Sequence, residues 1–278
     1  MAAVSENTGV ARLYKYRQDN DHTLQLLKNQ ELYLSFIRDF NDPFDCRIIA
    51  DFSGSDEKSW ESLTERKQIP EPIKQGALGG LRSIGFDANE AKRIYGEAES
   101  RTYIICCFSE IRNSVLMWSH YARSHHGICV GFEVAAKDEF LFLRTDDCDL
   151  KRHPQKAFRD WLRLSKVIYC DECPKPYNVF NDPRRIITFL KTKAKDWEHE
   201  QEHRIILPHG EINKNVVRFH RSSLKEIILG CKIRDDFKNK LLSTIRTEYI
   251  SQGYSVDVYQ SSLHESRYTL SFEKLEIG

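Results

Sequence analysis

The chain from residue 102 onward holds several continuous apolar runs that constrain its fold. Residues 102–110 (TYIICCFSE) and 127–134 (GICVGFEV) are typical of buried strands. Further strands are predicted at 166–171 and 203–208, and a helix at 115–122. Because strands and helices do not alternate strictly, we expect an α+β fold with mixed or antiparallel sheets and flanking helices, not a doubly wound parallel sheet.

Composition places these segments in a soluble globule. The 278 residues suffice for one large domain or two small ones, and 30% charged against 40% hydrophobic residues is typical of folded chains. No apolar run approaches the roughly 20 residues that span a bilayer, and the N-terminus lacks the layout of a signal peptide. We therefore expect a cytoplasmic protein without a membrane partner. We predict a single domain over residues 1–278, with a helical insertion or cover at about 54–100, where the chain is most polar.

Net charge and cysteine spacing argue against a global attraction for nucleic acid, against disulfides and against a zinc site. The formal net charge is +1, so no global field attracts nucleic acid, and any such binding needs a local patch. In a reducing cytosol the 8 cysteines are not expected to form disulfides. Cys170 and Cys173 make up a CxxC spacing, but no second pair accompanies them, so a zinc site is not expected.

The strongest local signal for chemistry is a run of three carboxylates before the strand at 203–208. Glu198, Glu200 and Glu202 alternate, so an extended chain would point all three to one side. Crowded carboxylates repel, which raises a pKa or requires a cationic partner. Such groups are candidate catalytic residues. The alternative is a helix end at which the glutamates pair with Arg204, Lys195 or another base.

A second signal follows the apolar strand at 102–110. Ser109 stands at the end of that strand, where α/β folds place ligands. The helix at 115–122 carries Trp118 and Tyr121, whose rings are suited to wall a pocket for a planar group. The alternative for these aromatic residues is core packing at helical spacing.

A third signal is the strand at 13–17 (LYKYR), which ends in Arg17. A guanidinium binds phosphate or carboxylate through two parallel hydrogen bonds, so Arg17 is a candidate anion-binding residue. The alternative is an ordinary solvated strand end. The Asn-Asp-Pro turn at residues 41–43 is expected to be structural. Asp42 or Asp45 near it is a candidate to orient Arg17.

The order of these blocks resembles the widespread, mostly bacterial family called domain of unknown function 2971. The blocks run from about Leu13 to Gly230 and read LYKYR, ELYLSF with NDPFDC, CFSE, MWSHYARSHHGICVGF, VIYCDECP, EQEHRII and KEIILG. The family label itself implies no activity.

A more distant resemblance implies chemistry. Glu200-Gln-Glu202, followed by an apolar strand, is similar to the biglutamate motif of ADP-ribosyltransferases. Those enzymes assemble an NAD pocket from three strand ends: an Arg or His on the first, a Ser-containing stretch on the second and a Glu on the third. The resemblance implies an ADP-ribosyltransferase-like fold with Arg17, or a neighbour such as Tyr16, Ser109 and Glu202 in these roles. The middle motif here offers one serine where the enzymes have Ser-Thr-Ser.

This resemblance implies NAD as the cosubstrate. Glu202 would stabilise the oxocarbenium-like state, and Glu200 would position or deprotonate the acceptor. Arg17 would hold the pyrophosphate, and Tyr121 or Trp118 would stack on nicotinamide or adenine. The acceptor is an unknown protein or nucleic acid, or water in an NAD glycohydrolase. A bacterial toxin or a phage-defence effector is the expected setting.

Two other hypotheses compete with this one. A metal-dependent nuclease or phosphodiesterase would hold its ion with carboxylate and imidazole ligands. These candidates are Asp42, Asp45, Glu110, Glu200 and His120 or His126. A noncatalytic ligand-binding module would instead use the glutamates and arginines as a structural ion-pair network. Glycine-rich nucleotide motifs, a GxSxG elbow and an HExxH zinc motif are all absent from the sequence.

Overall fold

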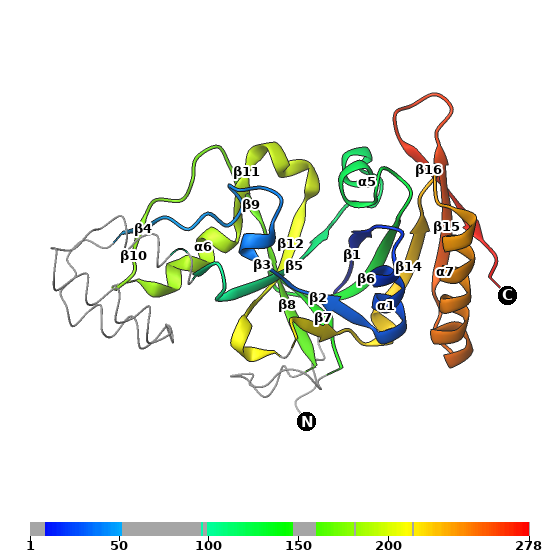
Figure 1. Cartoon of the computed structure of the whole chain (residues 1–278), viewed down its shortest axis with the longest axis horizontal. Helices are drawn as coiled ribbons and strands as arrows, with labels where there is room; N and C mark the ends of the chain where they lie inside the picture. The colour runs from blue at the N-terminus through cyan, green and yellow to red at the C-terminus, as the bar shows by residue number, and fades with distance from the viewer. Residues whose placement is uncertain are drawn as a thin grey trace. The chain divides into compact units, whose positions relative to one another are not determined.

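A computed structural model describes residues 9–51, 96, 99–146, 160–180, 182–212 and 214–277. The helical cover predicted at about 54–100 lies almost wholly outside these residues. The chain divides into two compact units (Figure 1). The first comprises residues 1–34, 105–167 and 196–278, and the second comprises residues 35–104 and 168–195.

The first unit is built on a closed six-stranded barrel. Its strands lie in the order β1, β5, β12, β8, β7 and β6, and β1 then pairs with β6 along its whole length. The strands are β1 Gly9–Arg17, β5 Tyr103–Ser109, β12 Glu202–Pro208, β8 Trp161–Lys166, β7 Phe140–Arg144 and β6 Ile128–Lys137. Closure pairs the strands with one another, so the barrel has no free sheet edge within the ring.

The apolar runs of the sequence form the buried strands of this barrel. The predicted strand at 127–134 is the core of β6, and Val130, Phe132 and Val134 on one of its faces are at most 1% exposed. The predicted strand at 102–110 is β5. Alternate residues of a strand face opposite sides, so β6 turns Cys129 and Gly131 to the other face.

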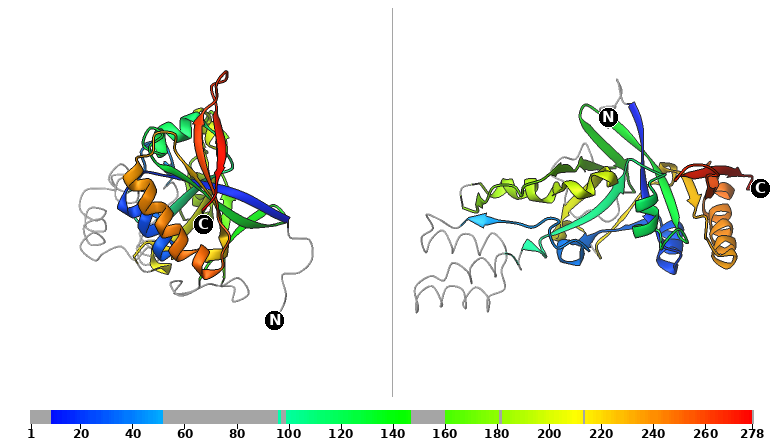
Figure 2. Two further views of the ribbon diagram at one scale, coloured as in Figure 1. Left: turned by 90° about the vertical axis from the view of Figure 1, so that its right-hand side faces the viewer. Right: turned by 90° about the horizontal axis from the view of Figure 1, so that it is seen from above.

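The sheet continues from β6 beyond the barrel. β14 (Leu224–Leu229) pairs antiparallel with β6, β15 (Asp257–Leu263) pairs parallel with β14, and β16 (Leu270–Leu275) pairs antiparallel with β15. Helix α7 (Asp235–Glu248) connects the two parallel strands and lies beside α1 (Asp21–Asn29), as both views in Figure 2 show. The predicted α+β class with antiparallel sheets is therefore confirmed.

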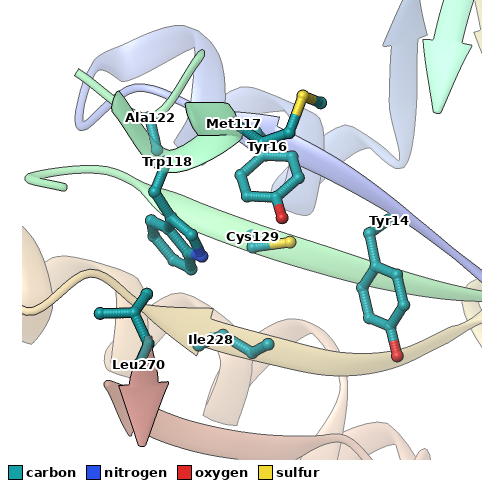
Figure 3. Close-up of a cluster of buried hydrophobic side chains, with 8 residues drawn as sticks. All are labelled: Tyr14, Tyr16, Met117, Trp118, Ala122, Cys129, Ile228 and Leu270. Carbon is teal, nitrogen blue, oxygen red and sulfur yellow. The ribbon is translucent and has the colours of Figure 1, made fainter. Parts of the chain in front are cut away.

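A short helix covers the face of β6 that carries Cys129. Helix α5 (Val115–Tyr121) begins at Ser114, whose hydroxyl accepts from the backbone N–H of Met117. Figure 3 shows the resulting apolar cluster. Its members come from β1, α5, β6, β14 and β16 and are Tyr14, Tyr16, Met117, Trp118, Ala122, Cys129, Ile228 and Leu270.

The described residues of the second unit include small sheets and the short helix α6 (Ile186–Leu190). β4 (Ala50–Asp51) pairs with β10 (Tyr177–Asn178), and β9 (Ile168–Cys170) pairs with β11 (Thr192–Ala194), both in parallel. The expected Asn-Asp-Pro turn is present, with the Asp42 carboxylate accepting from the Phe44 N–H at 2.9 Å. Asp45 forms an ion pair with Lys193, and both side chains are buried.

Two predictions about elements need correction. The helical spacing at 186–199 predicts one helix, but α6 ends at Leu190, β11 follows, and residues 195–200 form a 3-10 turn. The predicted strand at 166–171 is divided, because Lys166 ends β8 and β9 begins at Ile168. Within the described ranges, no helix is both long enough and apolar enough to cross a bilayer.

Candidate functional site

The end of β5 meets the start of β12 at one rim of the first unit. Ser109 is 1% exposed, and its hydroxyl donates to the backbone carbonyl of Glu200 at 2.6 Å. The Glu110 N–H donates to the carbonyl of Gln201 at 3.0 Å. The structure therefore brings the predicted serine segment into direct contact with the glutamate segment.

The two glutamates of the biglutamate motif do not share a strand face, which corrects the extended-chain prediction. Glu200 ends a 3-10 turn and Glu202 begins β12. Gln201 between them has a positive φ of 44°, which turns the chain. Glu198, the third member of the run, is exposed.

Glu200 is a buried carboxylate with a tyrosine partner. Its side chain is 3% exposed, and Oε1 accepts a hydrogen bond of 2.6 Å from the hydroxyl of Tyr121 on α5. Hydrogen bonds to a charged acceptor are shorter and stronger than neutral ones. Tyr121 is therefore placed to hold the Glu200 carboxylate in position.

Glu202 is enclosed by Arg204. The guanidinium donates through Nε and Nη2 to the two carboxylate oxygens at 2.8 and 2.9 Å. The side chains of Arg204 and Glu202 are 0% and 4% exposed. This bidentate contact is the ion pair that the structural alternative predicts for this run. Glu202 and Glu200 are equally buried, at 4% and 3% exposed, so what distinguishes them here is the bidentate ion pair of Glu202.

Aromatic rings line the surface next to Tyr121 and Glu200. The exposed imidazole of His120 lies 6.4 Å from the half-buried ring of Trp197 and 6.3 Å from that of Tyr121, between ring centroids. Trp197 lies 6.0 Å from His199. Sequence reasoning singled out Trp118 and missed Trp197, although Trp197 directly precedes the glutamate run.

Trp118 and Tyr16 occupy the core. Trp118 is 0% exposed, and its indole N–H donates to the carbonyl of Arg112 at 2.9 Å. The Tyr16 hydroxyl donates to the carbonyl of Ile111 at 2.7 Å, and its ring meets Trp118 edge-on at 5.4 Å (Figure 3). Core packing, the alternative stated for Trp118, therefore describes that residue, and Tyr16 packs in the same apolar cluster.

Arg17 lies apart from the other predicted site residues. Its side chain is largely buried, and desolvation lowers the pKa of its guanidinium. Among the residues that the structure describes, no hydrogen bond or ion pair joins Arg17 to Ser109, Glu200 or Glu202. The contact between the second and third segments is therefore present, whereas Arg17 takes no direct part in it.

The described residues also bear on the metal-dependent alternative. Over these ranges, no three His, Cys, Asp or Glu side chains gather as a metal site would require. Asp45 is paired with Lys193 in the second unit, whereas Glu110 and Glu200 lie in the first.

His203, next to Glu202 on β12, makes stability depend on pH. Its ring is 4% exposed, and burial lowers its pKa below the ordinary value of 6.5, although Glu110 at 3.6 Å favours the charged form. At a pH between the two pKa values, His203 is therefore protonated in the unfolded chain but neutral in the folded chain. We expect the free energy of unfolding, measured by urea denaturation, to fall as the pH drops below about 6.5.

His203→Asn is expected to weaken this dependence of stability on pH, and the exposed His22→Asn to leave it unchanged. The same pH dependence in both variants would contradict the assignment to His203.

Comparison with known proteins gives one match. Residues 117–205, from α5 into β12, match the model of a family described as a protein of unknown function (DUF2971). No curated protein and no solved structure matches the chain. The matched region contains Tyr121, Glu200 and Glu202, and it confirms the resemblance drawn from the order of the sequence blocks. Over residues 117–205, about a third of its length, the chain is thus similar to the DUF2971 family.

Proposed function

We propose that the first unit is an NAD-consuming enzyme, either an ADP-ribosyltransferase with an unknown protein or nucleic-acid acceptor or an NAD glycohydrolase. The observation that carries the proposal is the 2.6 Å hydrogen bond from Ser109 to the backbone of Glu200. The ADP-ribosyltransferase resemblance requires the serine strand and the biglutamate segment to meet in this way. An ADP-ribosyltransferase-like pocket at this rim, and a role as a cytoplasmic bacterial toxin or phage-defence effector, belong to the same proposal.

The proposal assigns the catalytic carboxylate to Glu200 in preference to Glu202. Cleavage of the nicotinamide–ribose bond develops positive charge on the ribose, which a nearby carboxylate stabilises. Glu202 is neutralised by a bidentate ion pair with Arg204, whereas one oxygen of Glu200 accepts from the Tyr121 hydroxyl, a donor that a ribose hydroxyl resembles. The rings of His120 and Trp197, which meet edge-on at 6.4 Å beside Tyr121, would offer an aromatic surface to a planar base.

A direct assay tests this assignment. Purified protein is incubated with NAD, and the release of nicotinamide is followed by chromatography. Glu200→Gln keeps the shape of the side chain and removes its charge, so we expect activity to fall by roughly 100-fold or more.

Glu198→Gln is the matched control, because Glu198 belongs to the same run but is exposed. We expect it to retain the wild-type rate. Intact NAD after incubation with the wild-type protein, with and without candidate acceptors, would reject the enzyme hypothesis. Full activity in Glu200→Gln would reject the role of Glu200 alone.

A noncatalytic ligand-binding module is the second candidate. The observation in its favour is the complete burial of the Glu202–Arg204 pair, which is typical of a structural ion pair. This candidate predicts unchanged NAD in the same assay.

A further inference from the structure

A second cluster of charged residues is centred on β6 and includes none of the residues assigned to the proposed function. Its centre is Gly131 on β6, which pairs with Tyr14 on β1 and with Glu226 on β14. A Cβ on Gly131 would lie 3.0 Å from the Glu226 Cβ, 3.1 Å from the Tyr14 ring and 3.4 Å from the Arg12 Cδ. The glycine therefore leaves the space in which these three side chains converge.

The buried carboxylate of Glu226 orients two arginines. Its side chain is 3% exposed, and Arg12 donates to Oε2 at 3.2 Å. Arg112 donates from a single nitrogen, Nη1, to both carboxylate oxygens at 3.0 Å. The register of β14 shifts between Leu224 and Glu226, an irregularity of the kind that re-aims a side chain.

Both guanidinium groups keep donors for a ligand. Arg12 and Arg112 are 36% and 39% exposed, and each uses only Nη1 on Glu226. Among the described residues, neither guanidinium makes any other hydrogen bond or ion pair. An arginine carries five N–H donors in a fixed fork, so Nε and Nη2 of both side chains are available.

Aromatic rings restrict the movement of Arg112. Its guanidinium lies 5.2 Å from the ring centroid of Phe272 and 5.8 Å from that of Tyr259. These distances are typical of cation–π contacts. The Tyr14 hydroxyl points toward β14 in Figure 3, away from the indole of Trp118. Two guanidinium groups thus meet at the Glu226 carboxylate, and the Tyr14 ring lies beside them at Gly131.

The local charge favours an anion. Two arginines against one glutamate leave one net positive charge. Glu133 lies opposite Arg12 in the register, but it is paired with Lys225 at 3.9 Å and adds no net charge to the cluster. A carboxylate has two oxygens, which a single guanidinium fork satisfies. A phosphoryl group has three acceptor oxygens and a charge of about −1.5 to −2, which matches two forks and a hydroxyl.

We propose that Arg12 and Arg112, held by Glu226, form a binding site for the phosphoryl group of a small molecule. The Tyr14 hydroxyl completes the site as an additional donor. Glu226 is a positioning residue that does not touch the ligand. The site does not depend on NAD being the cosubstrate, because the donors recognise the phosphoryl oxygens alone.

Calorimetric titration tests the site with inorganic phosphate, adenosine 5′-monophosphate, adenosine and acetate. We expect phosphate and the monophosphate to bind and adenosine and acetate not to bind. Arg12→Ala and Arg112→Lys are each expected to weaken phosphate binding about tenfold or more, because each removes a fork. Arg163→Lys is the matched control, since Arg163 also stacks on a ring, that of Phe140 at 3.7 Å. It should bind phosphate like the wild type.

The same titrations separate the sources of the phosphoryl group. Binding of the monophosphate at least tenfold tighter than that of phosphate points to a phosphorylated organic ligand, and equal affinities point to free phosphate. Either result supports the site. Three results would reduce the cluster to an ion-pair network and overturn the proposal. They are acetate binding as tightly as phosphate, no phosphate binding at about 10 mM, and wild-type affinity in Arg112→Lys.

A second measurement uses the wild-type protein alone, so it tests the site even if the variants fail to fold. Phenylglyoxal modifies accessible arginines, and mass spectrometry of the digested protein reports each position. We expect phosphate to protect Arg12 and Arg112 from modification and to leave Arg163 unprotected. Equal modification of all three with and without phosphate would also overturn the proposal.

Discussion

Arg204→Ala is expected to lower the free energy of unfolding by about 3–5 kcal/mol, because it leaves the Glu202 carboxylate buried without this cation. In the native protein the guanidinium reaches both carboxylate oxygens, at 2.8 and 2.9 Å, and is itself 0% exposed. A carboxylate at that depth does not regain the hydration it lost on folding. Urea unfolding at pH 7, followed by circular dichroism, measures the change.

Two controls separate the ion pair from the loss of side-chain volume. Replacing both partners, Glu202→Leu with Arg204→Met, removes both charges together and is expected to recover much of the stability. Arg218→Ala breaks a pair with Glu31 at 3.6 Å in which both side chains are partly exposed, and should cost less than about 1 kcal/mol. A cost for Arg204→Ala no greater than that for Arg218→Ala would contradict the assignment of a buried charge pair.

The strands of the barrel are the part of the fold that the sequence predicts best. Buried strands are mainly apolar, so the runs at 127–134 and 203–208 correspond to β6 and β12, although β12 also buries His203 and Arg204. The stretch at 186–199 misleads because Ile187, Leu190, Ala194 and Trp197 have helical spacing. There the pairing of β11 with β9 outweighs local periodicity.

Barrel closure is not predictable from local patterns. β1 and β6 pair at residues more than 100 positions apart, such as Arg17 with Ile128. Apolar periodicity shows that a strand is buried but not which strand is its neighbour. The same reason explains why the cluster around Glu226 escapes sequence reasoning, since Arg12, Arg112 and Glu226 come from three distant segments.

The candidate site is predicted in part. Ser109 and the glutamate run meet, because each flanks a barrel strand and the strands are neighbours. The different surroundings of Glu200 and Glu202 depend on the positive φ of Gln201, and glutamine is not a residue that signals such a conformation. Arginine two residues after Glu202 is visible in the sequence, and it marks the ion pair that encloses Glu202.

The turn after α5 brings backbones into contact at two glycines. Arg123, Ser124 and His125 have consecutive positive φ angles of 46°, 52° and 71°, which turn the chain from α5 into β6. The Gly230 N–H donates to the carbonyl of Gly127 at 2.9 Å. Cβ atoms at these two glycines would overlap neighbouring backbone: the Arg17 carbonyl for Gly127, and the His125 carbonyl for Gly230.

Gly230→Ala is therefore expected to lower the free energy of unfolding by about 3 kcal/mol. The added methyl group would overlap the His125 carbonyl and approach the Gly127 carbonyl oxygen to 2.7 Å. The His125 carbonyl cannot easily withdraw, because it accepts from the Lys232 N–H at 3.0 Å. Gly210→Ala is the matched control, since nothing lies within 4 Å of a Cβ there, and it should change stability by less than about 0.5 kcal/mol. Equal urea midpoints for the two variants would show that the α5–β6 turn accommodates the added methyl group, which would contradict the prediction.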